Sequence, residues 1–414
     1  MAKVITTELQ HSGASAANIT LDSSKNVTCE NNLQVDGNVT VTGTLPADKL
    51  TGNLPAISGA SLTGISSQDT LSHRNLLING SMKIDQRGDN SSNTGNAFGG
   101  PDRWKWIGGG DATCNTRQGG ASDIAGFANQ YKVSVGTADT SIGASQYVAL
   151  QQNLEGFDVQ KIEKGFSSAK QLTLSFWLKL TNVTGVFTVQ LRDNDNTRHC
   201  CKQFTVSDAN WNKYTLTFPA DTTGKFGDDN GSSLSVNFYW TAGTDYTSGT
   251  LASTWASVTT ANICPGQTGN FIGSTSNVLE LTGVQLELGA TATDFEYRTY
   301  GDELQRCLRF YWNVAKGHDK VIAHGYSHSG SYGTLQHNFP VPMRATPSLD
   351  YVSATDYYNW EQHGSGTNFA SFGGIERGLE TQAQVYWSAS GTQGSGIRIR
   401  TFNASASYSL NAEL

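Results

Sequence analysis

Short runs in which every second side chain is apolar are the feature that most constrains this chain. One such run covers residues 171–180, and others occupy residues 186–191, 214–218, 234–240 and 278–288. A period of two residues is that of a β-strand with one buried face. Many short strands separated by turns favour a jelly-roll β-sandwich, which we expect over residues 75–300.

The alternation changes phase once within the run at 278–288. Leu279 and Leu281 share one phase, whereas Val284 and Leu286 share the opposite one. The change falls at Gly283, where one extra residue in the strand would restore the core face. This pattern predicts a β-bulge.

The composition supports an all-β chain with real cores. Glycine is frequent, with 45 residues, and charged residues make up only 15%. This bias disfavours long helices and favours strands joined by turns. The 9 Trp, 15 Tyr and 17 Phe residues argue against disorder, which requires few aromatic side chains.

Residues 18–65 carry two short repeats that cannot support a core within one chain. Pairs of apolar residues recur every six residues, namely Val27/Cys29, Leu33/Val35 and Val39/Val41, and Leu-Thr-Gly recurs at 50 and 62. Repeated units of this kind need stacked neighbours, and three chains around one axis would close their strand edges. We therefore predict an intertwined β stalk of several chains, trimeric in that closed arrangement, and a hinge over 18–74, preceded by an attachment segment at 1–17. A flexible linker is the alternative.

After residue 300 the pattern returns to strands. A short helix is expected at 302–309, with Asp302 as its N-cap. Apolar alternation at 309–312, 384–387 and 396–402 then predicts further strands. Residues 301–414 are expected to form a smaller C-terminal β-sandwich at the tip.

Charge and cysteine content exclude several kinds of partner. The net charge is −7 and no basic run exists, so we expect no nucleic-acid binding. No apolar stretch approaches ~20 residues, so we expect no membrane insertion, and the first ten residues show no secretory signal. The six cysteines form no CxxC motif and are expected to be reduced and buried. We expect no cofactor and no metal.

Four blocks of sequence resemble parts of tailed-phage tail fibres and receptor-binding proteins. Their residues are 50–64 (LTGNLPAISGASLTG), 75–88 (NLLINGSMKIDQRG) followed by 102–104 (DRW), 283–296 (GVQLELGATATDFE) and 303–311 (ELQRCLRFY). The first is similar to a fibre stalk repeat. The second and third are similar to the opening and the last strand of fibre domains that look like carbohydrate-binding modules, and the fourth to the segment that follows them.

The resemblance implies a virion tail fibre that mediates attachment of a phage to its host. It implies a homotrimer that docks on a tail or baseplate protein through its N-terminus. It further implies adsorption to a polysaccharide or lipopolysaccharide of the host surface. Residues 312–414 are similar to fibre tips only in their general character and share no motif with them. The resemblance therefore assigns no binding residues in this part of the chain.

Two segments of the tip combine aromatic rings with polar side chains, as glycan sites do. The first holds Tyr357, Tyr358, Asn359, Trp360, Glu361 and His363. The second holds Tyr326 and Tyr332, with His324 and His328 nearby. Core or interface packing is the alternative for the first segment, and a polar surface loop for the second. Two histidines alone do not make a metal site.

No catalytic signature appears in the sequence. Glycan cleavage needs two carboxylates held across a groove, and no spacing in this sequence indicates such a pair. Motifs of the GxSxG and HExxH types are absent. We therefore expect a non-catalytic attachment fibre. The alternatives are a structural tail or baseplate fibre without a receptor, and a depolymerising tailspike.

Overall fold

The computed structural model describes residues 73–120, 123–329, 331–388 and 391–414, together with three short strands near the N-terminus. These strands, β1 (Glu8–Leu9), β2 (Ile19–Leu21) and β3 (Val27–Cys29), pair in the antiparallel order β1-β2-β3. The chain divides into residues 1–66 and residues 67–414. Apart from those strands and residues 73–74, the predicted attachment segment and trimeric stalk lie outside the described residues. The trimeric stalk therefore stays a prediction.

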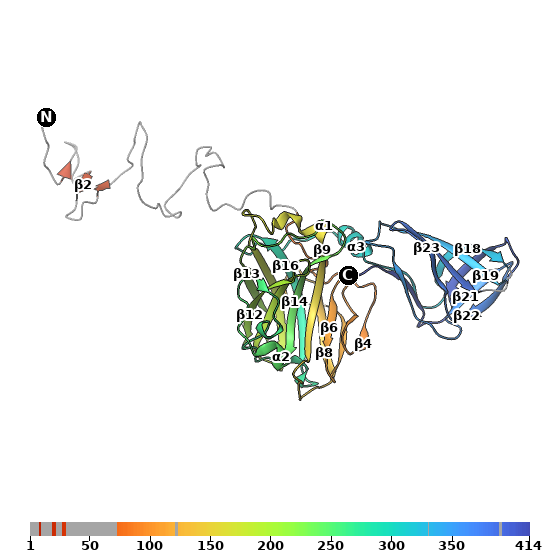
Figure 1. Cartoon of the computed structure of the whole chain (residues 1–414), viewed down its shortest axis with the longest axis horizontal. Coiled ribbons are helices and arrows are strands. Elements are labelled where there is room, and N and C mark those ends of the chain that lie inside the picture. Colours follow the sequence, from red (N-terminus) through yellow and green to blue (C-terminus); the bar gives the residue numbers. More distant parts are fainter. Residues whose placement is uncertain are drawn as a thin grey trace. The chain divides into compact units, whose positions relative to one another are not determined.

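Two antiparallel sheets form what we call the first sandwich (Figure 1). The six-stranded sheet has the order β13 (Asn212–Phe218), β10 (Leu172–Thr181), β16 (Val278–Leu288), β8 (Asn129–Thr137), β7 (Thr113–Gly120) and β4 (Asn90–Asn93). The seven-stranded sheet has the order β15 (Ala256–Ser257), β12 (Arg198–Val206), β11 (Gly185–Asp193), β14 (Ser232–Ala242), β9 (Tyr147–Glu155), β6 (Lys105–Gly109) and β5 (Ala97–Phe98). Short turns of helix join them: α1 (Gly156–Val159), η4 (Gln160–Ile162), α2 (Thr244–Thr247), η5 (Thr260–Asn262) and η6 (Phe271–Gly273).

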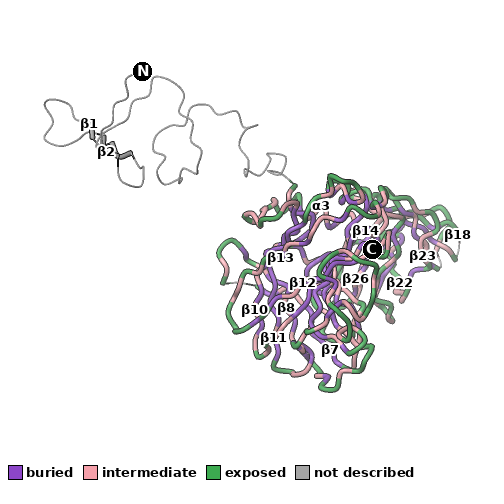
Figure 2. The backbone as a smooth tube through the Cα atoms, turned by 60° about the vertical axis from the view of Figure 1, so that its left-hand side comes forward, coloured by how far each residue is buried: buried purple, intermediate pink, exposed green. Residues whose placement is uncertain are grey.

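Aromatic side chains from both sheets meet in the core of the first sandwich. Phe176 of β10 lies edge-to-face against Phe238 of β14, with ring centroids 5.1 Å apart. Phe238 in turn stacks on Trp240 at 5.9 Å. All three are fully buried, and each contributes roughly 1.5–3 kcal/mol through apolar burial. The predicted all-β fold, with alternating strands that bury one face, is confirmed (Figure 2).

The predicted β-bulge is present in β16. Ser175 pairs with Gln285, but Trp177 pairs with Thr282, so two residues of β16 oppose the single residue Phe176. Gly283 lies in this bulge with φ +62°, a conformation that glycine adopts without the strain of a side chain. The bulge turns both apolar phases of the strand toward the same core.

The segment at 75–88 runs alongside β16 and is held by its asparagines. The side-chain oxygen of Asn75 accepts hydrogen bonds from the backbone N–H groups of Leu77 and Leu286. The side-chain oxygen of Asn79 accepts from Lys83 and Ile84. Both asparagines are buried, so these bonds replace the ones that water would make.

The expected helix is α3 (Tyr300–Leu308), but its N-cap is Thr299. The Thr299 hydroxyl accepts a hydrogen bond from the backbone N–H of Asp302 at 3.2 Å. The expectation that Asp302 caps the helix was therefore wrong, because the helix begins two residues earlier. Asp302 lies in the first turn and pairs with Arg306 one turn later.

Residues 311–411 build a second pair of antiparallel sheets, which we call the second sandwich. The three-stranded sheet has the order β17 (Tyr311–Lys316), β26 (Ser407–Asn411) and β20 (Ser348–Tyr351). The seven-stranded sheet has the order β22 (Ser365–Phe369), β21 (Tyr358–Gln362), β25 (Gly396–Thr401), β18 (Val321–Ser329), β19 (Tyr332–Asn338), β24 (Gln382–Ser388) and β23 (Gly374–Gly378). Buried rings of Tyr358 and Tyr408, one from each sheet, and of Phe372, from the connection between β22 and β23, fill the space between the sheets.

Arginines link the residues that follow α3 to the first sandwich. Arg309 donates two hydrogen bonds to the buried carboxylate of Glu155. Arg103 pairs with Glu413 and lies 3.4 Å from the ring centroid of Phe310. Because these groups are largely buried, the contacts require the two sandwiches to present matching surfaces.

The five cysteines in the described part of the chain are buried free thiols, as predicted for them. Burial raises the pKa of the Cys114 thiol to about 12 and that of Cys200 to about 11. These thiols therefore stay protonated at neutral pH. Cys29 lies outside the residues whose side chains are described.

A search for membrane-spanning helices found none within the described residues.

Candidate glycan-binding face

The segment predicted as a glycan site forms a strand, not a turn. In β21, Tyr358 and Trp360 point into the second core, where they are 0% and 6% exposed. The Tyr358 hydroxyl, which has one proton to donate, lies within hydrogen-bonding distance of the backbone carbonyls of Val352 and Ser407, at 2.9 and 2.7 Å. Neither ring offers a face to a ligand, so the sugar-stacking role predicted for these two residues does not fit. Both instead have the core role that was the alternative.

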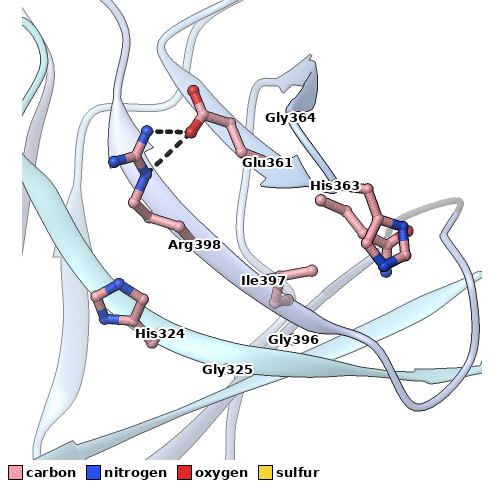
Figure 3. Close-up of a pocket in the computed structure, with 9 residues that line it drawn as sticks. His324, Gly325, Glu361, His363, Gly364, Gly396, Ile397 and Arg398 are labelled. Atoms are coloured by element: carbon pink, nitrogen blue, oxygen red, sulfur yellow. Dashed lines mark hydrogen bonds and ion pairs between the residues drawn. The ribbon is translucent and has the colours of Figure 1, made fainter.

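The other residues of that segment are divided between the core edge and the surface. Tyr357 packs half-buried against the second core. Asn359 is buried, and its amide donates to the side-chain oxygen of Asn368 at 2.8 Å. Glu361 and His363 both line a hollow in the outer surface of the sheet (Figure 3). The predicted residues that remain available to a ligand are therefore Glu361 and His363.

The register of the strands brings five polar side chains into one line, which we call the polar row. Glu361 of β21 pairs with Arg398 of β25, which pairs with His324 of β18. The pairing of Gly325 with Leu335 puts His324 beside Gln336 of β19, which pairs with Gln384 of β24. Directly paired residues in antiparallel strands lie on the same face. The polar row therefore crosses five strands on the face opposite the core.

The β21 end of the polar row carries a balanced set of charges. Arg398 donates from Nε to Oε2 of Glu361 at 2.9 Å, as Figure 3 shows. Arg400 pairs with Oε1 of Glu361 at 2.7 Å and with Asp319 at 2.5 Å. Hydrogen bonding from Arg400 lowers the pKa of Asp319. Two carboxylates and two guanidinium groups leave this end without net charge.

Four rings lie beside the polar row, and we call them the aromatic group: Tyr326, His328, Tyr332 and Tyr386. Tyr332 stacks on Tyr386 with ring centroids 5.4 Å apart, and His328 meets Tyr332 edge-on at 5.6 Å. Tyr326 is 45% exposed. Burial and a hydrogen bond with Glu376 raise the pKa of Tyr332. The structure thus brings the two predicted tyrosines, Tyr326 and Tyr332, together.

The sequence reasoning overlooked Tyr386, Gln336 and Gln384. A signal for Tyr386 was present, because Trp387 is an obvious core residue and its neighbour in a strand must face outward. His324 and His328 lie on strand β18, so the expected polar surface loop is incorrect for them. No cluster of three or more metal-ligating side chains was found in the described residues.

Three hollows follow the polar row. The first, of about 380 Å³, includes His324, Glu361 and Arg398 in its lining. The second, of about 360 Å³, includes His324, Tyr326 and Gln336. The third, of about 460 Å³, includes Gln336, Gln384 and Arg377. The face therefore presents concave polar surface with a ring at its side, an arrangement suited to a polar ligand with apolar faces.

Thr334 forms part of the second hollow and has an unsatisfied hydroxyl. Its direct cross-strand partners on the same face are Tyr326 and Tyr386. The Thr334 oxygen is buried and has no hydrogen-bond partner among the described residues. A buried polar atom left without a partner is costly, so this hydroxyl is a feature that a bound ligand group could satisfy.

Comparisons with known proteins find distant structural similarity only. No protein-family model matches the chain. No curated protein matches it. A putative sugar-binding protein from Bacteroides thetaiotaomicron is similar at 12% identity and a TM-score of 0.28, over 52% of this chain and all of that one. The tandem CBM22 domains of Xyn10C from Paenibacillus barcinonensis are similar at 12% identity and a TM-score of 0.26, over 82% and 96% of the two chains.

The enzymatically active domain of tailspike protein 4 of bacteriophage CBA120 is a third similar structure. The identity is 11%, the TM-score is 0.27, and the match covers 52% of this chain and 21% of that one. The chain is thus an all-β protein of antiparallel sandwiches, with distant structural matches to carbohydrate-binding modules and to a phage tailspike domain.

Proposed function

We propose that this chain is a non-catalytic virion tail fibre that attaches a phage to a glycan on the host surface through its second sandwich. The observation that carries the proposal is the aromatic group beside the polar row, on one outer face. A sugar ring has an apolar face that stacks on aromatic side chains and hydroxyls that bond to amides, imidazoles and guanidinium groups. Tyr326 supplies the exposed ring, and Gln336 and His324 supply the bonding groups.

The attachment role rests on the resemblance of the sequence blocks to tail fibres. The N-terminal residues would dock on a tail or baseplate protein, and the stalk would hold three copies together. The ligand would be a polysaccharide or lipopolysaccharide of the host. Light scattering of the full chain would test the trimer, and a mass of one chain would rule out the shared stalk.

A non-catalytic role is consistent with the state of two carboxylates at the β21 end of this face, Glu361 and Asp319. Glu361 is ion-paired with both Arg398 and Arg400. The pKa of Asp319 is lowered, whereas a general acid in glycan cleavage needs a raised pKa. Reducing sugar released from host polysaccharide by the purified chain would contradict this part of the proposal.

Host-cell binding by the full chain tests the function. Replacing Tyr326 with Ala should weaken binding about tenfold or more, because it removes the exposed ring. Tyr300→Ala is the matched control, since Tyr300 is 54% exposed but lies on α3, away from the face. Equal loss in both variants, or in neither, would reject the second sandwich as the receptor-binding part. Full binding by both would favour a different site, whereas no binding by the unaltered chain would favour the alternative of a structural fibre without a receptor.

A further inference from the structure

The three hollows of the second sandwich adjoin one another. The first and second share His324 and Gly325 in their linings. The second and third share Gln336 and Gln384. They therefore form a row of adjoining hollows, which we call the track, and the row crosses the sheet from strand to strand.

We propose that the track binds an internal stretch of an unbranched glycan chain rather than a terminal sugar. This inference rests on the proposed function and specifies the class of ligand. It follows from the length of the track, from its open β21 end and from the chemistry along it.

The length of the track suits several sugars. It runs from β21 through β25, β18, β19 and β24 to β23, which is five steps between neighbouring strands. At ~4.8 Å for each step, the track spans about 24 Å. One step is close to the advance of one pyranose in an extended chain, so about five sugars could lie along it.

A glycine leaves the β21 end of the track open. Gly364 is part of the lining there, and a Cβ on it would meet no atom within 4 Å. At this position no side chain forms a wall that stops a chain continuing beyond the track. A site for a terminal sugar needs such a wall, because it must tell an end from a continuing chain.

Neutral amides occupy the middle of the track, whereas charges stand at its ends. Gln336 and Gln384 are paired across β19 and β24, and each amide can both donate and accept. The ion pair of Glu361 and Arg398 lies at one end, and Arg377 lies at the other. Tyr326 flanks the middle, where Thr334 holds its unpaired hydroxyl. The middle of the track thus suits neutral sugars. The amides and the Thr334 hydroxyl can bond to sugar hydroxyls, and the Tyr326 ring can stack against the apolar face of a sugar.

Calorimetric titration of the full chain tests the inference. The probes are size-fractionated oligosaccharides of one to eight units, prepared by partial acid hydrolysis of the surface polysaccharide of a host strain. Affinity should rise with length up to about five units and then level off. A chain blocked at its terminal sugar by chemical derivatisation should bind as well as the free chain.

Two variants locate the binding. Gln336→Ala should lower the affinity for the five-unit oligosaccharide about five- to tenfold. Gln393→Ala is the control, since it removes an exposed glutamine in the turn between β24 and β25, outside the lining of the three hollows. An equal effect of both variants would overturn the proposed track.

The outcomes distinguish a failure of the internal-chain inference from a failure of the proposed function on which it rests. If one- or two-unit fragments bind as tightly as long ones, or if terminal blocking abolishes binding, the function stands and the internal-chain inference fails. If neither the fragments nor the intact polysaccharide bind, the proposed function fails, and the inference fails with it.

Discussion

Arg309, the residue that follows α3, forms a bidentate ion pair with Glu155, the last residue of β9. Arg309 donates from Nε at 2.8 Å and from Nη2 at 2.7 Å, one bond to each carboxylate oxygen. Two parallel bonds of this kind fix the orientation of both groups. The Glu155 side chain is 2% exposed, so without the arginine its charge would be buried alone.

Replacing Arg309 with Met should therefore destabilise the chain. We expect a loss of about 2 kcal/mol in the free energy of unfolding, below the value for fully buried pairs because the Arg309 side chain is 31% exposed. Urea unfolding of the full chain measures it. Adding Glu155→Gln to this variant should recover part of the loss, since the unpaired charge is then gone. A double variant no better than Arg309→Met would contradict this account.

The bulge in β16 should tolerate no side chain. A Cβ on Gly283 would lie 2.8 Å from the Phe127 ring and 3.0 Å from Trp177, and φ is already +62°. Gly283→Ala should cost roughly 2–4 kcal/mol from backbone strain plus overpacking. Gly394→Ala is the control, because φ there is +80° and the new Cβ meets no atom within 4 Å. Gly394→Ala should cost about 1 kcal/mol for strain alone, and equal losses would show that crowding plays no part.

The second sandwich should lose stability in mild acid because of His337. Burial lowers the pKa of His337 to about 4, from 6.5 in the unfolded chain. Between these values the unfolded state binds a proton that the folded state does not, so stability falls as the pH drops from 6.5 to 4. The loss should approach 3 kcal/mol in total. His337→Gln should remove this part of the pH dependence in urea titrations, and an unchanged slope would refute the assignment.

Thr334 should show opposite effects on stability and on binding. Val has the shape of Thr without the hydroxyl, so Thr334→Val should raise the stability of the free chain by about 1 kcal/mol. The same change should lower glycan affinity about threefold, because a ligand group loses its partner. Thermal unfolding and calorimetric titration measure the two effects. A variant that is more stable and binds as well as before would show that the hydroxyl is only a packing defect.

The strand pattern was readable from the sequence where one face of the strand is strictly apolar. The predicted run at 278–288 coincides with β16, including the bulge at Gly283. Such a strand has only one phase that buries its apolar side chains, so the local pattern suffices. The cap of α3 was misassigned because Thr299 and Asp302 are both good N-cap residues, and only the helix start distinguishes them.

The candidate site was less accessible to prediction because two rings, Tyr357 and Tyr358, are adjacent at the start of β21. The alternation alone does not say which one enters the core. The polar row poses a harder problem, since Glu361, Arg398 and His324 come from three separate strands. Their alignment depends on strand register, which long-range pairing sets and local sequence does not.

The buried thiols have a practical consequence for studying this chain. All five cysteines with described side chains are buried and free, so maleimide reagents at neutral pH should leave them unmodified. If Cys29 is changed to Ser, a single cysteine introduced at an exposed position such as Ser353 would be the one reactive handle in that part of the chain. A dye attached there would allow the proposed cell binding to be followed by fluorescence, with the five buried cysteines left in place.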